Sequence, residues 1–446
     1  MTCGVPMGNR QPCDRPLYDD ERCIFHSTRI DKDLDLFNRE LEALVRQDHS
    51  LDCTSFILPE KVRTFEGQTF SWDVSFRHAV FLGFCAFPGV QFVGKADFTG
   101  AQFTRVEFAE AHFGGAALFA RCQFLGDTTF AGARFQDMVS CHQTHFAGPM
   151  NFSQTRVTGR ADFSRAEFAS GALFTGARFR TGVNFAGTQF QRKAGFNRAR
   201  FADEVYFSET KFPGGREGES ETGADITEVS FERPEKAHFY LVDASRLSFL
   251  KTQLRKVDFT DVMWARRKNG RAALWDELRQ EGAKDYAEVA RLYRQLRANF
   301  EQEGDHRAAA DFRYGQMEMQ RRNAGGGNPA GRFLNRTFSL LTCYKALSDY
   351  GENPTRAATW ILVTLVLFGL LFAMAGFNGG PVGRGDDDVP ALIGAGLQAS
   401  VAAFTLQPGH LAASLSGFGH WLALLEGVIG PFLLIVWGFA VVRSLR

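Results

Sequence analysis

Four candidate metal ligands lie within the first 26 residues of the chain: Cys3, Cys13, Cys23 and His26. Their spacing, C-x9-C-x9-C-x2-H, supplies three thiolates and one imidazole, a donor set that suits tetrahedral zinc. The stretch around them is rich in Gly and Pro and cannot form a hydrophobic core of its own. We therefore predict a zinc-binding knob over residues 1–27, structural rather than catalytic because all four ligand positions are filled. Unliganded thiols and redox chemistry are the alternatives.

Glu426 is the second candidate for chemistry. It lies in an apolar stretch from Trp421 to Val442, the second of two segments long enough to cross a bilayer. The first such segment runs from Ala357 to Gly376 without a charge. A carboxylate inside a membrane is energetically expensive and usually faces the interior of a helix bundle or water, so Glu426 is the best functional candidate in this region. An interfacial position near the outer end of the helix is the alternative.

A further apolar segment, Leu392 to Gly409, separates the two spans and is interrupted by Gly and Pro. The order span, re-entrant helix, loop and span resembles the two-transmembrane pore module of potassium-type channels, in which a short helix ends in T-V-G-Y-G. The corresponding place reads T-L-Q-P-G, and L-L-E-G-V-I-G downstream resembles the start of the inner helix of that module. The resemblance gives these candidate pore-lining residues: Thr405, Leu406, Gln407, Pro408, Gly409 and Glu426.

The altered filter puts potassium selectivity in question, because Gln-Pro cannot reproduce a Gly-Tyr-Gly backbone. Poorly selective conduction, conduction of a different ion and no conduction are all open. Two helices cannot enclose a pore alone, so any channel must be a homo-oligomer, and the resemblance implies four copies.

Basic residues flank the outer ends of the two spans, whereas the loop between them is acidic. The loop carries Asp386, Asp387 and Asp388 with only Arg384. The positive-inside rule then places both chain ends in the cytoplasm, in a multi-pass protein of a bacterial inner membrane. The flanking basic residues are Arg332, Arg336, Lys345, Arg356, Arg443 and Arg446.

A repeat occupies most of the chain between these two candidate sites. From Phe65 to Phe212 a large apolar residue, nearly always Phe, recurs at steps of five and six residues, with a small residue two positions before most of them. A helix needs apolar residues every three or four positions and a strand every two, so neither period fits. A coiled solenoid, in which each Phe stacks on the Phe one coil away, does fit.

The repeat resembles that of the pentapeptide-repeat family, commonly A-(D/N)-L-x-x with Phe often in place of Leu. A-D-F at 161–163 and A-E-F at 166–168 match it directly. The resemblance implies a mainly β protein, a right-handed quadrilateral β-helix with four repeats per coil. The 28 core positions in residues 61–212 then make seven coils. One six-residue step is shortened to five, between Phe103 and Phe108.

The charge of the repeat bears on possible partners. Some members of this family resemble duplex DNA in shape and charge, and such a mimic should be acidic. Residues 61–212 contain 17 Lys or Arg against 12 Asp or Glu, and the whole chain has a net charge of +1. The sequence therefore predicts no DNA mimicry and no nucleic-acid partner.

The remaining segments are assigned from changes along the chain. Residues 28–60 are predicted to form a capping helix and a lead-in to the repeats. The helix should carry one apolar face, formed by Ile30, Leu34, Phe37, Leu41, Leu44 and Val45. The other segments are a surface loop at 213–223, final repeats with a closing cap at Trp264 over 224–268, a helical hairpin at 269–324, a linker and interfacial segment at 325–356, and the two-transmembrane module at 357–442.

The predicted hairpin breaks at Gly304 and packs through Tyr293, Phe312, Tyr314 and Met317. It resembles the hairpin that follows the repeats in membrane-attached members of the family. Two functions fit this organisation. The first is an oligomeric, ion-channel-like pore whose cytosolic solenoid senses an unidentified protein partner. The alternative is a non-conducting, membrane-tethered interaction scaffold. An enzyme is disfavoured, because the sequence lacks a P-loop, a nucleophile elbow and an H-E-x-x-H motif.

Overall fold

The computed structural model describes residues 2–8, 11–46, 50–60, 65–213, 223–279, 285–323, 339–375, 389–406, 415 and 417–444. The chain divides into two compact units, Met1–Phe312 and Arg313–Arg446. The first unit contains a β-solenoid and the elements that close its two ends. The second unit is helical.

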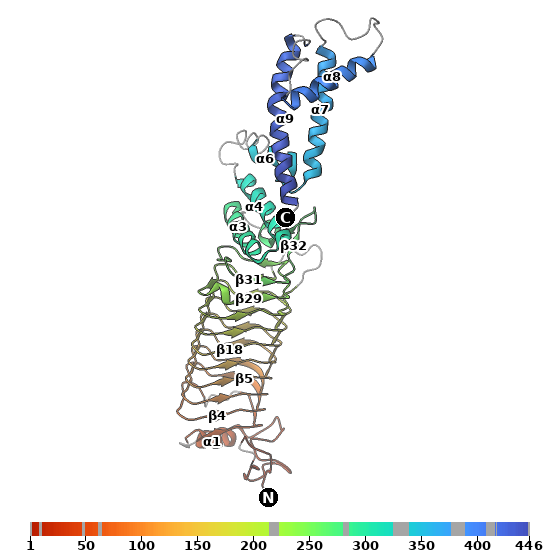
Figure 1. The fold of residues 1–446 in the computed structure, drawn as a ribbon. Coiled ribbons are helices and arrows are strands. Elements are labelled where there is room, and N and C mark those ends of the chain that lie inside the picture. The colour runs from red at the N-terminus through yellow and green to blue at the C-terminus, as the bar shows by residue number, and fades with distance from the viewer. Residues whose placement is uncertain are drawn as a thin grey trace, which may run out of the picture. The chain divides into compact units, whose positions relative to one another are not determined.

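Residues 51–260 wind into a four-sided β-helix, whose stacked strands are visible in Figure 1. Equivalent strands of successive coils pair in parallel and in register. Ala117 is opposite Val139 and Phe124 is opposite Phe146, so a typical coil contains 22 residues, as four repeats averaging five and a half residues require. The predicted quadrilateral solenoid is therefore confirmed.

Three parallel sheets make up the four faces. The 10-stranded sheet contains β1 (Leu51–Asp52), β4 (Val74–Ser75), β7 (Ala96–Asp97), β10 (Ala117–Leu118), β14 (Val139–Ser140), β18 (Ala161–Asp162), β22 (Val183–Asn184), β26 (Val205–Tyr206), β29 (Ala237–Tyr240) and β31 (Asp258–Thr260). The 8-stranded sheet contains β3 (Thr69–Phe70), β6 (Gln91–Phe92), β9 (His112–Phe113), β13 (Arg134–Phe135), β17 (Arg156–Val157), β21 (Arg178–Phe179), β25 (Arg200–Phe201) and β28 (Ser230–Phe231).

The 13-stranded sheet covers the other two faces. One of these faces contains β2 (Ile57–Leu58), β5 (Val80–Ala86), β8 (Gln102–Glu107), β11 (Gln123–Phe124), β15 (His145–Phe146), β19 (Glu167–Phe168) and β23 (Gln189–Phe190). The next contains β12 (Thr128–Thr129), β16 (Met150–Asn151), β20 (Ala172–Leu173), β24 (Ala194–Gly195), β27 (Ala224–Asp225) and β30 (Leu247–Ser248), and β5 and β8 reach both.

The short step between Phe103 and Phe108 has a structural consequence. With one residue fewer at this corner, β8 continues through it without a turn, and pairs with β11 on one face and with β12 on the next. The two faces therefore form one continuous sheet. The register between Phe103 and Phe124 shows the shortened coil, which contains 21 residues.

The interior of the solenoid is a stack of aromatic rings. Phe163 stacks on Phe185 one coil away, with ring centroids 5.1 Å apart, and meets Phe174 of a neighbouring face edge to face. Both arrangements are favoured by the charge distribution of aromatic rings. Cys141 and Val157 fill two of the Phe positions and are buried, as predicted. Burial of each ring contributes roughly 1.5 to 3 kcal/mol, so the stack stabilises the fold without a ligand.

The amino-terminal end begins earlier than residue 61, the predicted start of the repeats. β1 and β2 lie inside the predicted lead-in and pair with β4 and β5. Here Cys53 and Phe56 are fully buried at inward positions. The sequence analysis missed this first coil because it has one Phe where later coils have several.

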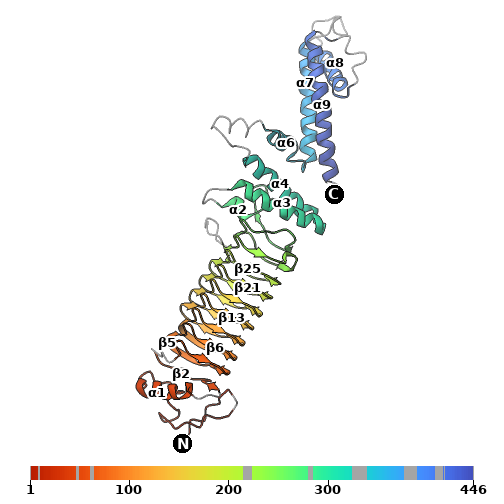
Figure 2. The same ribbon diagram turned by 90° about the vertical axis from the view of Figure 1, so that its left-hand side faces the viewer.

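A helix covers this end of the solenoid, as Figure 2 shows. α1 (Leu34–Val45) is capped by Asp33 rather than by Ser27 or Thr28, and it buries Phe37 and Leu41 as predicted. Ile30 precedes the helix and is 90% exposed, so its assignment to the apolar face was wrong. The helix is therefore shorter than the sequence indicated.

The carboxyl-terminal end is closed by two short elements and a helical hairpin. These elements are η1 (Pro234–Lys236), β32 (Ala265–Arg266), β33 (Ala272–Ala273), α2 (Trp275–Leu278), α3 (Tyr286–Glu303) and α4 (His306–Asn323). Gly304 has a φ of +81° and ends α3 in the left-handed conformation that glycine tolerates best, at the predicted break. Trp264 contacts Phe259 and Phe312, which fits a closing cap, whereas Met319 rather than Met317 is fully buried.

Polar side chains of α3 satisfy the open backbone edge of the last coil. The amide of Asn299 donates to the carbonyls of Leu254 and Val257, at 2.7 and 3.1 Å, and its oxygen accepts from the backbone N–H of Lys256 at 2.8 Å. Gln295 accepts from the N–H of Leu254. The edge that a further coil would have paired is thus occupied by side chains.

The second unit contains four further helices: α6 (Leu340–Ser348), α7 (Pro354–Ala375), α8 (Val389–Phe404) and α9 (Gly417–Ser444). α7 and α9 run side by side, and α8 packs against both (Figures 1 and 2). α7 and α9 are long and apolar enough to cross a membrane, whereas α8 is shorter, with 16 residues.

We expect Asn299→Ala to destabilise the solenoid from its carboxyl-terminal end. The substitution leaves three buried backbone groups without partners, so we expect a loss of roughly 2 to 3 kcal/mol and a lower thermal midpoint of the β-sheet signal in circular dichroism. Gln302→Ala, on the exposed side of the same helix, is the matched control. Equal midpoints for the two variants would show that the cap does not depend on Asn299.

Candidate metal centre and membrane module

The structure brings the four predicted ligands together. The donor atoms of Cys3, Cys13, Cys23 and His26 all lie within 4.8 Å of one another, and all four residues are buried. The Cys13 and Cys23 sulfurs are 3.9 Å apart, and Nδ1 of His26 is 3.3 Å from the Cys3 sulfur and 3.2 Å from the Cys23 sulfur. Two sulfurs bound to one tetrahedral zinc are about 3.8 Å apart. This group could therefore hold a metal ion.

A backbone carbonyl sets the orientation of the imidazole. Nε2 of His26 lies 3.1 Å from the carbonyl oxygen of Thr54, and Nδ1 faces the sulfurs. If Nε2 carries the proton and donates to Thr54, the lone pair of Nδ1 is free for a metal. Such a carbonyl partner is the usual means of fixing a metal-binding histidine. Arg15 adds a positive charge, with Nη1 3.6 Å from the Cys13 sulfur.

The environment of the ligands favours a bound cation. Burial raises the pKa of the Cys23 thiol to about 12 and lowers the pKa of His26 below its usual range. Burial also opposes ionisation of Cys3, but hydrogen bonds from the backbone of Cys23 and Val5 outweigh it and lower the pKa of that thiol. A metal ion would stabilise the buried thiolates and needs a neutral imidazole, which the low pKa of His26 provides.

The metal centre is part of the first coil. The backbone N–H of Ile57 donates to the carbonyl of Phe25 at 2.7 Å, and the ring of Phe25 stacks on Phe56 at 4.5 Å. His26 meets the edge of the same Phe56 ring. The segment that carries the ligands therefore acts as the outermost layer of the solenoid.

In the helical unit, Glu426 is fully buried where α8 meets α9. Its Oε1 lies 2.5 Å from the hydroxyl oxygen of Ser400, which is also 3.0 Å from the carbonyl of Leu365 on α7. Oε2 of Glu426 has no hydrogen-bond partner among the described residues. A carboxyl group thus links three apolar helices through one serine, and the interfacial position considered for Glu426 does not describe this environment.

The other predicted pore-lining residues are only partly described. Thr405 and Leu406 follow α8 and are exposed. Leu406 lies beside Gly427, the residue after Glu426, where an added Cβ would be 3.4 Å from its side chain. The structure therefore places the end of α8 near Glu426. Gln407, Pro408 and Gly409 lie outside the described residues.

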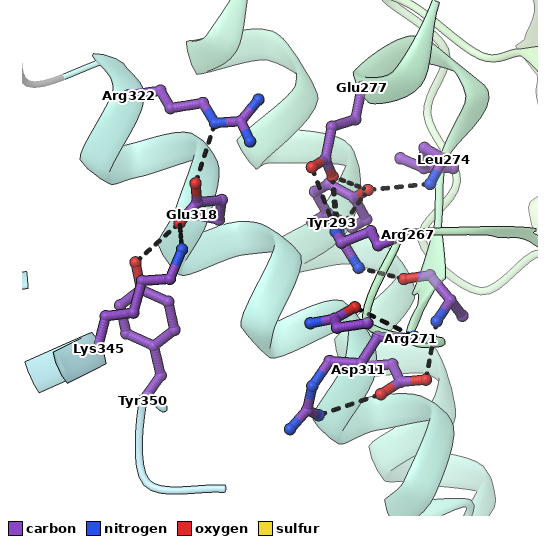
Figure 3. Close-up of polar contacts among 12 residues, drawn as sticks. Arg267, Arg271, Leu274, Glu277, Tyr293, Asp311, Glu318, Arg322, Lys345 and Tyr350 are labelled. Atoms are coloured by element: carbon purple, nitrogen blue, oxygen red, sulfur yellow. Dashed lines mark hydrogen bonds and ion pairs between the residues drawn. The ribbon is translucent and has the colours of Figure 1, made fainter. Parts of the chain in front are cut away.

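Two buried clusters of charged residues use all of their strong donors within the fold (Figure 3). In the first unit, Tyr293 donates to Glu277 at 2.6 Å, and Arg267 donates to Glu277 at 2.6 Å. In the second unit, burial opposes ionisation of Glu318, but hydrogen bonds from its cationic neighbours outweigh it and lower its pKa to about 2. The donors to Glu318 are Arg321, Arg322, Lys345 and Tyr350. Both clusters are structural ion pairs.

Several residues of these sites were missed from the sequence. Thr54 and Ser400 carried no signal, because one acts through its backbone and the other is an isolated serine in an apolar helix. Gln295 and Asn299 did carry one. They are four residues apart on the helical face that also bears Leu292 and Leu296, and a pair of amides on an apolar face indicates that the face meets backbone polar groups.

Comparison with known families supports the solenoid. Residues 108–155 and 152–196 match the family model described as Pentapeptide repeats (9 copies). The solenoid is a pentapeptide-repeat domain. Comparisons with curated proteins and with solved structures gave no match. Pentapeptide-repeat solenoids are generally structural or interaction proteins.

Proposed function

We propose that this protein is a membrane-tethered interaction scaffold, in which α7 and α9 cross a membrane and the pentapeptide-repeat domain binds a protein partner. The exposed apolar surface of these two helices carries the proposal. Leu362 and Leu367 on α7 are more than half exposed, as are Trp421 and Val428 on α9. Only 28% of the residues in each apolar segment are buried within the chain. A bilayer would remove this surface from water.

The charges at the helix ends support a cytoplasmic location for both chain ends. Arg443 at the end of α9 donates to the hydroxyl of Tyr344 and to the carbonyl of Tyr350, which precedes α7. The start of one span and the end of the other are therefore on the same side, together with Lys345 and Arg356. By the positive-inside rule this is the cytoplasmic side of a bacterial inner membrane.

We also propose that the Cys3, Cys13, Cys23 and His26 group binds one structural zinc ion. The observations that support zinc are the three sulfur donors, the free Nδ1 of the imidazole and the absence of a fifth ligand among the described residues. The ion would fix the ligand segment on the first coil and so close the amino-terminal end of the solenoid. With four protein ligands it has no open position for substrate.

An ion-conducting pore is the second candidate. Two observations favour it: the end of α8 lies beside α9 near Glu426, and Oε2 of Glu426 is buried without a partner among the described residues. A pore would require several copies of the chain, with four as the expectation. Glu426 in one chain is directed at Ser400, an intramolecular contact, and for this reason we place the scaffold first.

Metal analysis of the full chain tests the zinc proposal. We expect about one zinc per chain in the native protein and a loss of the metal with a lower thermal midpoint in Cys23→Ser, because the ion contributes directly to folding. Cys85→Ser is the control, since Cys85 is buried in the solenoid and has no part in the cluster. Less than about 0.3 zinc per native chain would contradict the proposal.

The orientation can be tested at Cys343 in α6, which is exposed, whereas the other seven cysteines are buried. We expect a membrane-impermeant maleimide to label Cys343 in inverted membrane vesicles and not in intact cells. Cys343→Ser should abolish the labelling and so identifies any reaction of the buried thiols. Labelling of Cys343 in intact cells would reverse the proposed orientation, and recovery of the protein in the soluble fraction would exclude the membrane.

The two candidate functions differ in oligomeric state and conductance. A scaffold should leave bilayers unpermeated, whereas a pore should give currents from a tetramer that change in Glu426→Gln. Glu301→Gln, an exposed substitution on α3, is the control for nonspecific effects. A monomer without currents in neutral lipid would exclude the pore, and Glu426-dependent currents would replace the scaffold by it.

A further inference from the structure

A column of four arginines runs along one face of the pentapeptide-repeat domain. Arg134, Arg156, Arg178 and Arg200 begin β13, β17, β21 and β25, and each lies directly opposite the next in parallel register. All four side chains are exposed. At a strand spacing of about 4.8 Å, this arginine column is roughly 14 Å long.

The arginine column is not neutralised by the fold. Elsewhere on the domain, charged residues of neighbouring coils form pairs, such as Arg198 with Glu228 at 2.8 Å and His145 with Glu167 at 3.2 Å. Within the part of the chain that the structure describes, none of the four column arginines has an ion pair or a side-chain hydrogen bond. Like charges directly opposite each other destabilise a sheet. The arginine column thus lowers the stability of the solenoid and has no structural role within it.

The arginine column borders a shallow groove of about 640 Å³. Small side chains in the next outward row, Thr158 and Ala202, leave the groove open beside the longer Arg180. A smaller hollow of about 160 Å³ lies at the corner by Arg134. The guanidinium groups are therefore accessible from outside along most of the column.

We propose that the arginine column is the docking site for an acidic helix of a protein partner. The proposal rests on the interaction role argued above and names the chemistry of the partner. A guanidinium binds a carboxylate through two parallel hydrogen bonds, so a matching row of carboxylates would both neutralise the column and fix the register of the partner.

The spacing of the column favours a helix. One face of an α-helix presents a side chain about every 5.4 Å, so four glutamates one turn apart extend roughly 16 Å, within about 2 Å of the column. The flexible stems of arginine can accommodate that difference. Alternate residues of an extended strand are about 6.6 Å apart and extend roughly 20 Å, which fits the column less well.

The surroundings of the column disfavour a broad anionic surface. Carboxylates border it on several sides: Glu110 and Glu232 line the two hollows, and Asp162 and Glu204 line the next one, beside Arg160. A bilayer or a nucleic-acid duplex would meet these carboxylates as well as the arginines. A single narrow helix would contact the column and avoid the acidic borders.

The test uses the full chain in a neutral detergent and a fluorescent, alanine-rich helical peptide with glutamates one turn apart. We expect fluorescence anisotropy to show binding that weakens about tenfold or more in Arg156→Gln/Arg178→Gln. The control, Arg192→Gln/Lys193→Gln, removes the same charge from the exposed turn between β23 and β24 and should bind within about twofold of the native protein. The thermal midpoint of Arg156→Gln/Arg178→Gln should not fall, because opposed like charges have been removed.

Equal weakening in both double variants would reduce the binding to net charge and overturn the proposal. Absence of peptide binding would also overturn it, as would column-dependent binding of phosphatidylglycerol vesicles or of a single-stranded oligonucleotide in preference to the peptide. The labelling of Cys343 and the oligomeric state are independent of this measurement. The membrane-tethered arrangement can therefore stand where the acidic helix fails.

Discussion

Every strand of a parallel β-helix obtains its hydrogen bonds from the coils on either side, so the two end coils leave backbone donors and acceptors without partners. This constraint explains much of the chain outside the repeats. At the amino-terminal end, the N–H of Ile57 pairs with Phe25, and Lys32 donates to the Ile57 carbonyl at 2.7 Å. At the other end, Gln295 and Asn299 occupy the positions of a missing coil. Capping is required of any solenoid whose repeats contact only their neighbours.

The requirement for caps also places the candidate metal centre. Its four ligands come from a segment whose polar groups would otherwise cover the first coil without a core of their own. A metal ion supplies what a hydrophobic core cannot in so short a stretch, and the solenoid in return supplies Phe56 and the Thr54 carbonyl that hold His26. The cluster and the first coil therefore stabilise each other, and neither is a separate domain.

The repeat could be predicted from the sequence because its information is local: a five- to six-residue step in Phe determines four faces, and the short step at Phe103 even determines which faces merge. The metal ligands were predictable because thiols and imidazoles are rare and their chemistry is specific. The end caps were harder to predict. Asn299 acts on backbone groups that are more than 40 positions away, and the first coil around Cys53 has too few Phe residues to show the period. Ser400 was not predictable, because nothing in an apolar helix distinguishes a serine that bonds Glu426 from one that faces lipid.

The helical unit is packed by a different principle, since apolar side chains gain little from leaving lipid for protein. Close approach and a few polar contacts take the place of the hydrophobic effect. A Cβ added at Gly396 on α8 would lie 2.2 Å from the carbonyl oxygen of Gly369 on α7, so the two backbones touch. Gly430 on α9 lies against the ring of Phe404 in the same way. With these contacts and the link between Ser400 and Glu426, α7, α8 and α9 form a complete packing unit within one chain. An anchor needs no more than this, whereas a pore would have to use the opposite faces of the same helices.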